Sequence, residues 1–325
     1  MLTLSLRQEA AMDESTELLA VRVAELYYEE NKTQDEVGAL LGITRWKVGR
    51  LLTRAREAGI VRIAIVHPRA RRLDIERQLC DRFGLKDAVV VPLPIDDAEV
   101  NLRVAQAAAD YLAAVRPVPR TLGVSWGRTL DEVARLLAPG WTVGVQVVQI
   151  NGGVSLNSKQ GTAAQTAVTI AQKGHGQATL LPIPAILEQV ETKRAIERDR
   201  SVASVRALGA SASAYLYSAG VAGASSVHVD SGYLTEQDVD ELVAKGAVGD
   251  VVGRYIDSAG KIVDSALDER TVGIGLTELR AAEHAIFVVA GDAKHDVARA
   301  VVTSGLCSVI VTDEGTAHAL LEETT

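Results

Sequence analysis

The sequence predicts an α/β protein with a small N-terminal helical head and a large Rossmann-like domain. Its 325 residues are about twice the length of a typical domain. Apolar residues make up 47% of the chain and aromatic residues only 4%, a composition that suits helices packed on parallel strands. From residue 67 onward, short apolar runs alternate with helical patterns, which indicates a mostly parallel sheet with crossover helices. We therefore expect domains at 1–66 and 67–325, divided near Pro68 and the arginines that follow it.

The head is predicted to contain three helices. Apolar residues at helical spacing mark the first, Glu17–Glu29. Thr33 can cap the second helix, and Glu36 three residues later completes a capping box. Gly42 supplies a turn, and Thr44 can cap the third helix. The apolar faces of the second and third helices comprise Val37, Leu40, Leu41, Val48, Leu51, Leu52 and Ala55.

The outward face of the third helix is predicted to be basic. Its residues are Arg45, Trp46, Lys47, Arg50 and Arg54. The whole chain is acidic, with a net charge of -8 and a pI near 5.4, so basic residues gathered in one segment indicate a localised affinity for a polyanion.

This pattern favours a DNA-reading helix-turn-helix that binds double-stranded DNA. A recognition helix contacts base edges through its N-terminal residues. Base-reading roles are therefore expected for Arg45, Trp46 and Lys47, with Arg50 close behind. Phosphate contacts are expected for Thr33, Gln34 and Arg54, and Thr44 is also expected among the DNA-binding residues. The alternatives are an ordinary helical hairpin with a solvated polar face, or a surface that docks a protein partner.

The remaining chain is expected to alternate strands and helices. Helices are predicted at Leu73–Phe83, ended by Gly84, and at Ala98–Val115, Leu130–Leu137 and Lys294–Thr303. Strands are predicted at Gly59–Val66, Asp87–Pro92, Thr121–Val124, Thr142–Ile150, Ala285–Ala290 and Cys307–Thr312. Between them lie further elements at Thr162–Lys173, Ala178–Leu181, Glu188–Arg194, Val202–Ala207, Ala214–Ser218 and Glu236–Lys245.

Ligands of open α/β sheets bind at the carboxyl ends of the strands, so the loops there are the candidate sites. Gly123–Thr129 enters a helix with backbone N–H groups, hydroxyls and a guanidinium, which suits a phosphate. Asn151–Val154 offers glycines for close approach to a ligand. Gly249–Arg254 carries one carboxylate for sugar hydroxyls, and Ala290–Lys294 places a cation where the helix dipole disfavours it.

Other kinds of site have weak support in the sequence. No Walker loop or dinucleotide fingerprint is present, and we expect no cofactor. Five of the six histidines are scattered without metal-ligand spacing, so we expect no metal site and ordinary polar roles for each of the five. These residues are His175, His228, His284, His295 and His318. Cys80 and Cys307 lie far apart, and neither a secretory signal nor a long apolar run is evident, so we expect a cytoplasmic protein with no membrane contact.

The motifs together resemble the SorC-type family of bacterial sugar-responsive transcription regulators. The likeness covers nearly the whole chain, through TQDEVGALLGITRWKVGRLLTRAREAGIVRI, GVSWGRTL, NGGV, GDVVGRYIDSAGKIVD and AIFVVAGDAKHDVARAVVTSGLCSVIVTDEGTAHALL. The resemblance implies an effector domain similar to sugar-phosphate isomerases and glucosamine-phosphate deaminases. It also implies a tetramer whose affinity for operator DNA changes when a sugar, polyol or sugar-phosphate effector binds.

The resemblance also assigns effector-binding residues. It implies a phosphate cradle at Ser125, Trp126, Gly127, Arg128 and Thr129, adjoined by Gly152 and Gly153. Polar contacts are implied near Thr162 or Gln165, a hydroxyl-binding acid at Asp250 and a cation at Lys294.

Two positions depart from the family pattern. Asn151 stands where some relatives have a basic residue that binds phosphate or forms an imine with a sugar aldehyde, so an imine at this position is excluded. Gly49 stands in the recognition helix where the family commonly has Ser. Because Gly costs about 1 kcal/mol relative to Ala in a helix interior, we expect a close approach to DNA or to the supporting helix at Gly49.

Two functions of different classes follow. The first is a non-enzymatic transcription regulator in which effector binding shifts the protein between DNA-competent and incompetent arrangements. The alternative is a sugar-phosphate isomerase or deaminase with an accessory DNA-binding head. Isomerisation needs a positioned carboxylate base, and Asp250 is the candidate that these loops offer.

Overall fold

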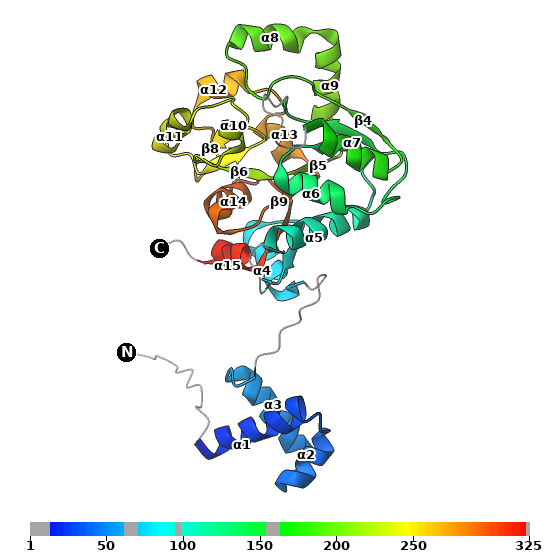
Figure 1. Cartoon of the computed structure of the whole chain (residues 1–325), viewed down its shortest axis with the longest axis vertical. Helices are drawn as coiled ribbons and strands as arrows, with labels where there is room; N and C mark the ends of the chain where they lie inside the picture. The colour runs from blue at the N-terminus through cyan, green and yellow to red at the C-terminus, as the bar shows by residue number, and fades with distance from the viewer. Residues whose placement is uncertain (1–13, 62–70, 95–98, 154–162, 323–325) are drawn as a thin grey trace, which may run out of the picture. The chain divides into compact units, whose positions relative to one another are not determined.

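The computed structural model of the protein describes residues 14–61, 71–94, 99–153 and 163–322. By its internal contacts the chain divides into two compact units, Met1–Ile65 and Val66–Thr325 (Figure 1). None of the described helices is long and apolar enough to cross a membrane.

The small unit is helical. It contains α1 (Glu14–Ala24), a π-helical turn η1 (Glu25–Glu29), α2 (Gln34–Leu41) and α3 (Arg45–Glu57). The residues that form its core include Val23, Leu26, Val37, Val48, Leu51, Leu52 and Ala55. The apolar face predicted for α3 is therefore confirmed. In α2 the prediction was wrong for Leu40, which is 60% exposed because α2 has only eight residues and turns Val37 toward the core instead.

Both predicted caps and the turn between α2 and α3 are confirmed. The Thr33 side chain accepts a hydrogen bond from the Glu36 backbone, and Glu36 reaches back to the Thr33 N–H, which forms the capping box. Gly42 adopts a left-handed conformation at φ 64°, which favours glycine. A β-carbon on Gly38 would lie 2.7 Å from the Ile43 carbonyl oxygen, so α2 can approach the turn closely only without a side chain there.

The strand predicted at Gly59–Val66 lies mostly outside the described residues. Its first three residues, Gly59 to Val61, form a turn and a bend rather than a strand. The turn is consistent with the left-handed φ of 73° at Gly59.

The large unit is built on a seven-stranded sheet with the order β1-β10-β9-β5-β2-β3-β4. The strands are β1 (Asp87–Val91), β2 (Thr121–Val124), β3 (Gln146–Gln149), β4 (Gln177–Thr179), β5 (Ala214–Tyr217), β9 (His284–Val288) and β10 (Val309–Asp313). Every pairing between neighbours is parallel. The predicted α/β class with a mostly parallel sheet is thus confirmed.

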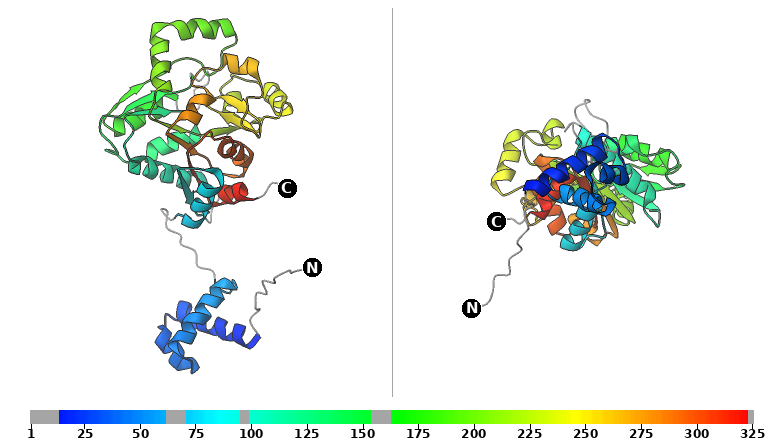
Figure 2. Two further views of the ribbon diagram at one scale, coloured as in Figure 1. Left: turned by 180° about the vertical axis from the view of Figure 1, so that it is seen from behind. Right: turned by 90° about the horizontal axis from the view of Figure 1, so that it is seen from below.

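Helices cover both faces of this sheet (Figures 1 and 2). One face packs on α5 (Val100–Ala114), α6 (Arg128–Leu136) and α7 (Ala163–Lys173). The other packs on α4 (Leu73–Phe83), α9 (Arg200–Ala210), α13 (Leu276–Ala281), α14 (His295–Thr303) and α15 (Glu314–Leu321). Alternate residues of each strand enter opposite cores, as Ile286 and Phe287 do in β9.

A second sheet was not predicted. It is antiparallel, has the order β6-β7-β8, and consists of β6 (Ala219–Val221), β7 (Gly249–Val251) and β8 (Arg254–Ile256). The helices of this region are α10 (Val227–Asp230), α11 (Glu236–Ala244) and α12 (Ser265–Arg270). The segment Gly249–Arg254, expected as a loop, is therefore a hairpin whose turn is formed by Val252 and Gly253 at positive φ.

Two further boundaries differ from the sequence prediction. The strand expected at Thr142–Ile150 covers only Gln146–Gln149, because Gly144 at φ 79° breaks the extended chain before it. The segment Val202–Ala207 belongs to helix α9, which follows α8 (Val190–Arg198) and is capped by Asp199.

Candidate functional site

The candidate site lies where the strand order of the main sheet reverses. From β2 the sheet extends through β3 and β4 toward one edge. From the neighbouring strand β5 it extends through β9 and β10 toward the opposite edge. Ligands of open α/β sheets bind at the carboxyl ends of strands at such a point. A cavity of about 490 Å³ lies there. Its lining includes Ser125, Trp126, Gly127, Arg128, Thr129, Asn151, Ser218, His228, Asp250 and Lys294.

The segment from Ser125 to Thr129 forms one wall. Ser125 is 5% exposed, and its N–H donates to the Leu216 carbonyl oxygen of β5 across 3.0 Å. Gly127, at φ 137°, turns the chain into α6, whose first residue is Arg128. The turn therefore presents the start of a helix to the cavity, where partial positive charge favours an anion.

Trp126 ties this wall to the loop after β3. Its indole N–H donates a 2.8 Å hydrogen bond to the Gly152 carbonyl oxygen. Two strand-end loops are thereby held at a fixed separation at the mouth of the cavity.

Two cations line the cavity without a direct ion pair among the described residues. Arg128 and Lys294 make no side-chain hydrogen bond or ion pair with any described residue. Burial lowers the pKa of Lys294; the charge of Asp250 opposes this shift, whereas that of Arg128 adds to it. Two like charges facing one cavity favour an anionic ligand group between them.

Three buried acceptor atoms line the same cavity without a hydrogen-bond partner among the described residues. They are Asp250 Oδ1, Asn151 Oδ1 and Ser218 Oγ. Asp250 is 6% exposed, and its other carboxylate oxygen accepts from the Gly253 N–H across 3.0 Å. Buried polar atoms are rarely left unpaired, so these atoms indicate where a ligand supplies hydrogen-bond donors.

Three described residues assigned by resemblance are not among the cavity-lining residues. Gly152 and Gly153 pack on the segment at Ile183 and Pro184: the Gly153 N–H donates to the Ile183 carbonyl oxygen, and a β-carbon on Gly152 would lie 2.4 Å from the Pro184 carbonyl oxygen. The glycine is thus needed for approach to the protein's own backbone. Gln165 lies on α7, where it donates to Thr169 across 3.0 Å and lines a separate groove. Thr162 lies outside the described residues.

Sequence reasoning missed several residues of the cavity, among them Ser218 and His228. Ser218 directly follows the buried strand β5, a position that the rule of strand carboxyl ends indicates. His228, expected to be an ordinary polar residue, is 2% exposed and lines the cavity from α10. Nothing in its local sequence signals this role, because the small antiparallel sheet brings α10 there.

Three carboxylates line the cavity in different environments. Glu132 pairs with Arg135 across 2.9 Å, and Asp292 has a side chain that is 96% exposed. Asp250 alone among the three is buried. Across the described residues, no group of three or more His, Cys, Asp or Glu side chains is arranged to hold a metal ion.

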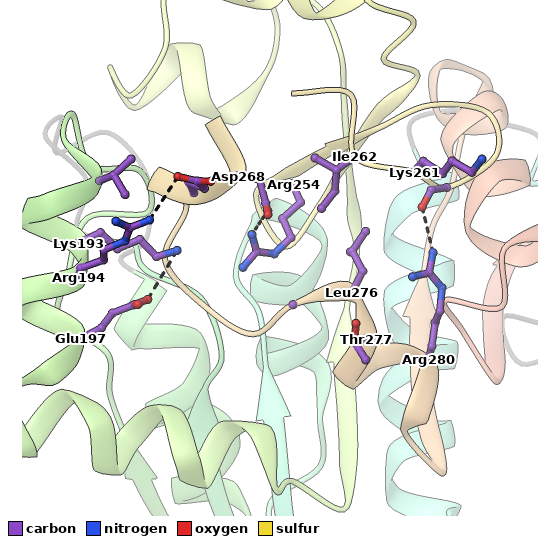
Figure 3. A pocket seen from close by; sticks show the side chains of 14 residues that line it. Lys193, Arg194, Glu197, Arg254, Lys261, Ile262, Asp268, Leu276, Thr277 and Arg280 are labelled. Carbon is purple, nitrogen blue, oxygen red and sulfur yellow. Dashed lines mark hydrogen bonds and ion pairs between the residues drawn. The ribbon is translucent and has the colours of Figure 1, made fainter. Parts of the chain in front are cut away.

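A second cavity of about 560 Å³ lies under α8, beside α12 and α13 (Figure 3). Three of the five cations that line it lie within 4 Å of a carboxylate. Arg254 forms a partly buried ion pair with Asp268 and donates to the Ile274 carbonyl oxygen, while Lys193 lies 3.8 Å from Glu197. Arg194 lies 3.6 Å from Glu269. This internal pairing makes the second cavity a weaker candidate for an anionic ligand than the one at the strand ends.

The outward face of α3 in the small unit is basic, as predicted. Trp46 is 71% exposed, and the Arg50 guanidinium stacks over its ring at 4.6 Å from the centroid. Lys47 and Arg54 are also exposed, and Arg45 lies 3.4 Å from Asp35 of α2.

The two capping threonines differ in their free hydrogen-bonding capacity. The Thr33 hydroxyl donates to Glu36 across 2.8 Å while it accepts from the Glu36 N–H, so its proton is already used. The Thr44 hydroxyl accepts from the Lys47 N–H across 3.2 Å and keeps its proton for another acceptor. Thr44 is therefore better placed than Thr33 to donate to a phosphate.

Comparison with known proteins places the chain among regulators. Residues 67–322 match the family described as "Putative sugar-binding domain". The deoxyribonucleoside regulator of Bacillus subtilis (strain 168) is 31% identical over 96% of this chain and 100% of that protein. The sorbitol operon regulator of Klebsiella pneumoniae is 30% identical over 94% of this chain and 98% of that protein. The crystal structure of full-length SorC from Klebsiella pneumoniae matches 96% of this chain and 100% of that chain, with a TM-score of 0.71 and 29% identity.

Proposed function

We propose that this chain, which belongs to the SorC-type family of sugar-binding transcriptional regulators, binds operator DNA under the control of a small polyhydroxy effector. The effector is a sugar, a polyol or a sugar phosphate that occupies the cavity at the ends of β2 and β5. The relatives described above are regulators whose names refer to a deoxyribonucleoside and to sorbitol, which supports this chemical class.

The observation that carries the proposal is the polarity of the cavity. Arg128 and Lys294 supply positive charge and make no direct ion pair or hydrogen bond with a described residue, and Asp250, Asn151 and Ser218 supply polar atoms without a partner there. Phosphate matches the cations, and hydroxyl groups match the acceptors. No bond needs to be made or broken for such a ligand to act, so we propose binding without catalysis.

DNA binding is proposed for the small unit, as a helix-turn-helix with α3 as the recognition helix. The capped helices, the left-handed Gly42 and the close contact at Gly38 support this geometry. The exposed basic face of α3 supports the role, with bases read by Arg45, Trp46, Lys47 and Arg50. Phosphate contacts are proposed for Gln34, Thr44 and Arg54.

A cytoplasmic tetramer is the proposed working form, on the basis of family resemblance. Light scattering after size exclusion should then give a mass near four times that of the 34.5 kDa chain. Coupling requires that the effector bind one arrangement of the protein more tightly than the other.

A thermal-shift screen tests the effector proposal. The panel comprises ribose, glucose, fructose, sorbitol and erythritol, each with its terminal phosphate ester, because a ligand of the folded state raises the melting temperature. We expect a phosphorylated compound to shift the melting temperature more than its parent, and Arg128→Ala to remove the difference. Arg128→Ala should still bind operator DNA without effector. If only unphosphorylated compounds act, the phosphate assignment is wrong.

A further inference from the structure

His228 is held against the cavity by two hydroxyl groups. The residue lies in α10, and Ser226 Oγ caps that helix by accepting from the His228 N–H across 3.3 Å. The Tyr255 hydroxyl lies 3.3 Å from His228 Nδ1 and 3.1 Å from Ser226 Oγ. His228, Ser226 and Tyr255 are all nearly inaccessible to solvent.

The surroundings of the ring favour one tautomer. In a neutral imidazole one ring nitrogen donates and the other accepts. His228 Nδ1 lies 3.9 Å from Asp250 Oδ1, and this negative charge favours a proton on Nδ1. Burial, reinforced by the charge of Asp250, raises the pKa of Tyr255, which therefore stays a hydroxyl. With the proton on Nδ1, the Tyr255 hydroxyl accepts from Nδ1 and its own proton is free to point to Ser226, and Nε2 is left as an acceptor.

The acceptor nitrogen lies near Gly253, another residue that lines the cavity. A β-carbon on Gly253 would lie 3.8 Å from Nε2, and Gly253 lines the cavity together with His228. Nε2 makes no hydrogen bond with any residue in the described ranges. It therefore joins Asp250 Oδ1 as an acceptor that has no hydrogen-bond partner among the described residues and belongs to a residue that lines the cavity.

We propose that His228 is a specificity-determining residue of the effector cavity, whose Nε2 accepts a hydrogen bond from a hydroxyl group of the effector. His228 Nε2 and Asp250 Oδ1 can only accept, so this end of the cavity selects a hydroxyl group and disfavours a carbonyl or carboxylate, which would face them acceptor to acceptor. This inference rests on the proposed function, because it assumes that a polyhydroxy effector occupies the cavity. The effector would bind with an anionic end at Arg128 and Lys294 and a hydroxyl-rich end at His228 and Asp250.

Two substitutions, each of which places an amide near one of the two ring nitrogens, distinguish a contact of His228 with the effector from a purely structural role of His228. An Asn side chain places its amide near the Nδ1 position, where it keeps the link to Tyr255, whereas a Gln amide reaches the Nε2 position. Dissociation constants are measured by calorimetry for those sugar and polyol phosphates of the panel that stabilise the wild type. We expect His228→Asn to bind about tenfold more weakly or worse, and His228→Gln to stay within about threefold of the wild type.

The opposite pattern, with binding kept in His228→Asn and lost in His228→Gln, would make His228 a support for Tyr255 and overturn the inference. Wild-type affinity in both variants would overturn it too, while loss of binding in Arg128→Ala would still uphold the proposed function. If no panel compound stabilises the wild type, both proposals fail.

A measurement on the wild-type protein adds a readout that does not depend on the affinity of either variant. In protein labelled with ¹⁵N-histidine, the His228 resonances are assigned by their absence from the spectrum of His228→Gln. Addition of the stabilising sugar phosphate should move the Nε2 resonance more than the Nδ1 resonance. An Nε2 resonance that stays in place at saturation would overturn the inference.

Discussion

Gly220 and Asp250 face each other across the pair β6–β7 so closely that a β-carbon on Gly220 would lie 2.0 Å from Asp250 Oδ1. The missing side chain is what allows the carboxylate to turn its free oxygen toward the cavity. The orientation of the Asp250 carboxylate therefore depends on the absence of a side chain at Gly220.

Gly220→Ala should displace the Asp250 carboxylate and weaken effector binding by about tenfold or more, since a buried charged acceptor contributes about 1.5–3 kcal/mol. Gly223→Ala is the matched control, because a β-carbon there meets nothing within 4 Å. Calorimetry with a stabilising sugar phosphate measures both variants. Equal affinities for the two would show that Asp250 does not contact the effector.

Effector binding should weaken as pH rises, because of Lys294. Its pKa is lowered from 10.5 in the folded protein, so unfolding takes up a proton at a pH between the lowered value and 10.5. The free energy of unfolding of the unliganded protein therefore rises with pH across that window. A bound anion stabilises the ammonium form and raises its pKa, so binding takes up a proton and its affinity falls across the same window.

Calorimetry between neutral pH and about pH 10 checks this dependence, because a phosphate ester, with a second pKa of about 6, keeps its charge in that range. Lys294→Arg should abolish it, since a guanidinium stays charged. A pH dependence that persists in Lys294→Arg would assign the proton to another group.

Arg45→Ala should weaken operator binding by about 1–3 kcal/mol and relax specificity at one base pair, if Arg45 reads a base. Asp35→Ala should not weaken binding, because it removes the acidic partner 3.4 Å from Arg45 and so frees the guanidinium. Fluorescence anisotropy on single-base operator variants distinguishes the outcomes. An equal loss on every sequence would make Arg45 a phosphate contact instead.

Gly49→Ala should change stability and DNA affinity in opposite directions. A β-carbon there meets only Gln34 Oε1 at 3.5 Å, an ordinary contact, so Ala should stabilise α3 by about 1 kcal/mol. The same methyl group should weaken operator binding if DNA approaches α3 at this point. Thr53→Ala is the control, because it adds no atoms to the helix. Unchanged DNA affinity in Gly49→Ala would leave the glycine without a role in recognition.

The predicted membership in the SorC-type family is confirmed by relatives that match nearly the full chain. Beyond family membership and fold class, the features that the sequence determined accurately depend on residues close together in the chain. Helix α4 and strand β2 have the predicted bounds, because a left-handed Gly84 and a short apolar run act within a few residues. The same holds for the Thr33 and Thr44 caps, whose partners lie three residues away.

The tertiary structure alone decided which polar groups share the cavity. Ser218 and Lys294 meet the Ser125–Thr129 wall because parallel strands far apart in sequence end at one edge of the sheet. Asp250 lies in the small antiparallel sheet and His228 in helix α10 of the same region. No local sequence pattern predicted that sheet. Gly152 and Gln165 fitted the family pattern, but their described contacts are with other residues of the protein: Gly152 packs on a backbone carbonyl group and Gln165 donates to Thr169. A glycine needed for packing and a glycine needed for a ligand look alike in sequence.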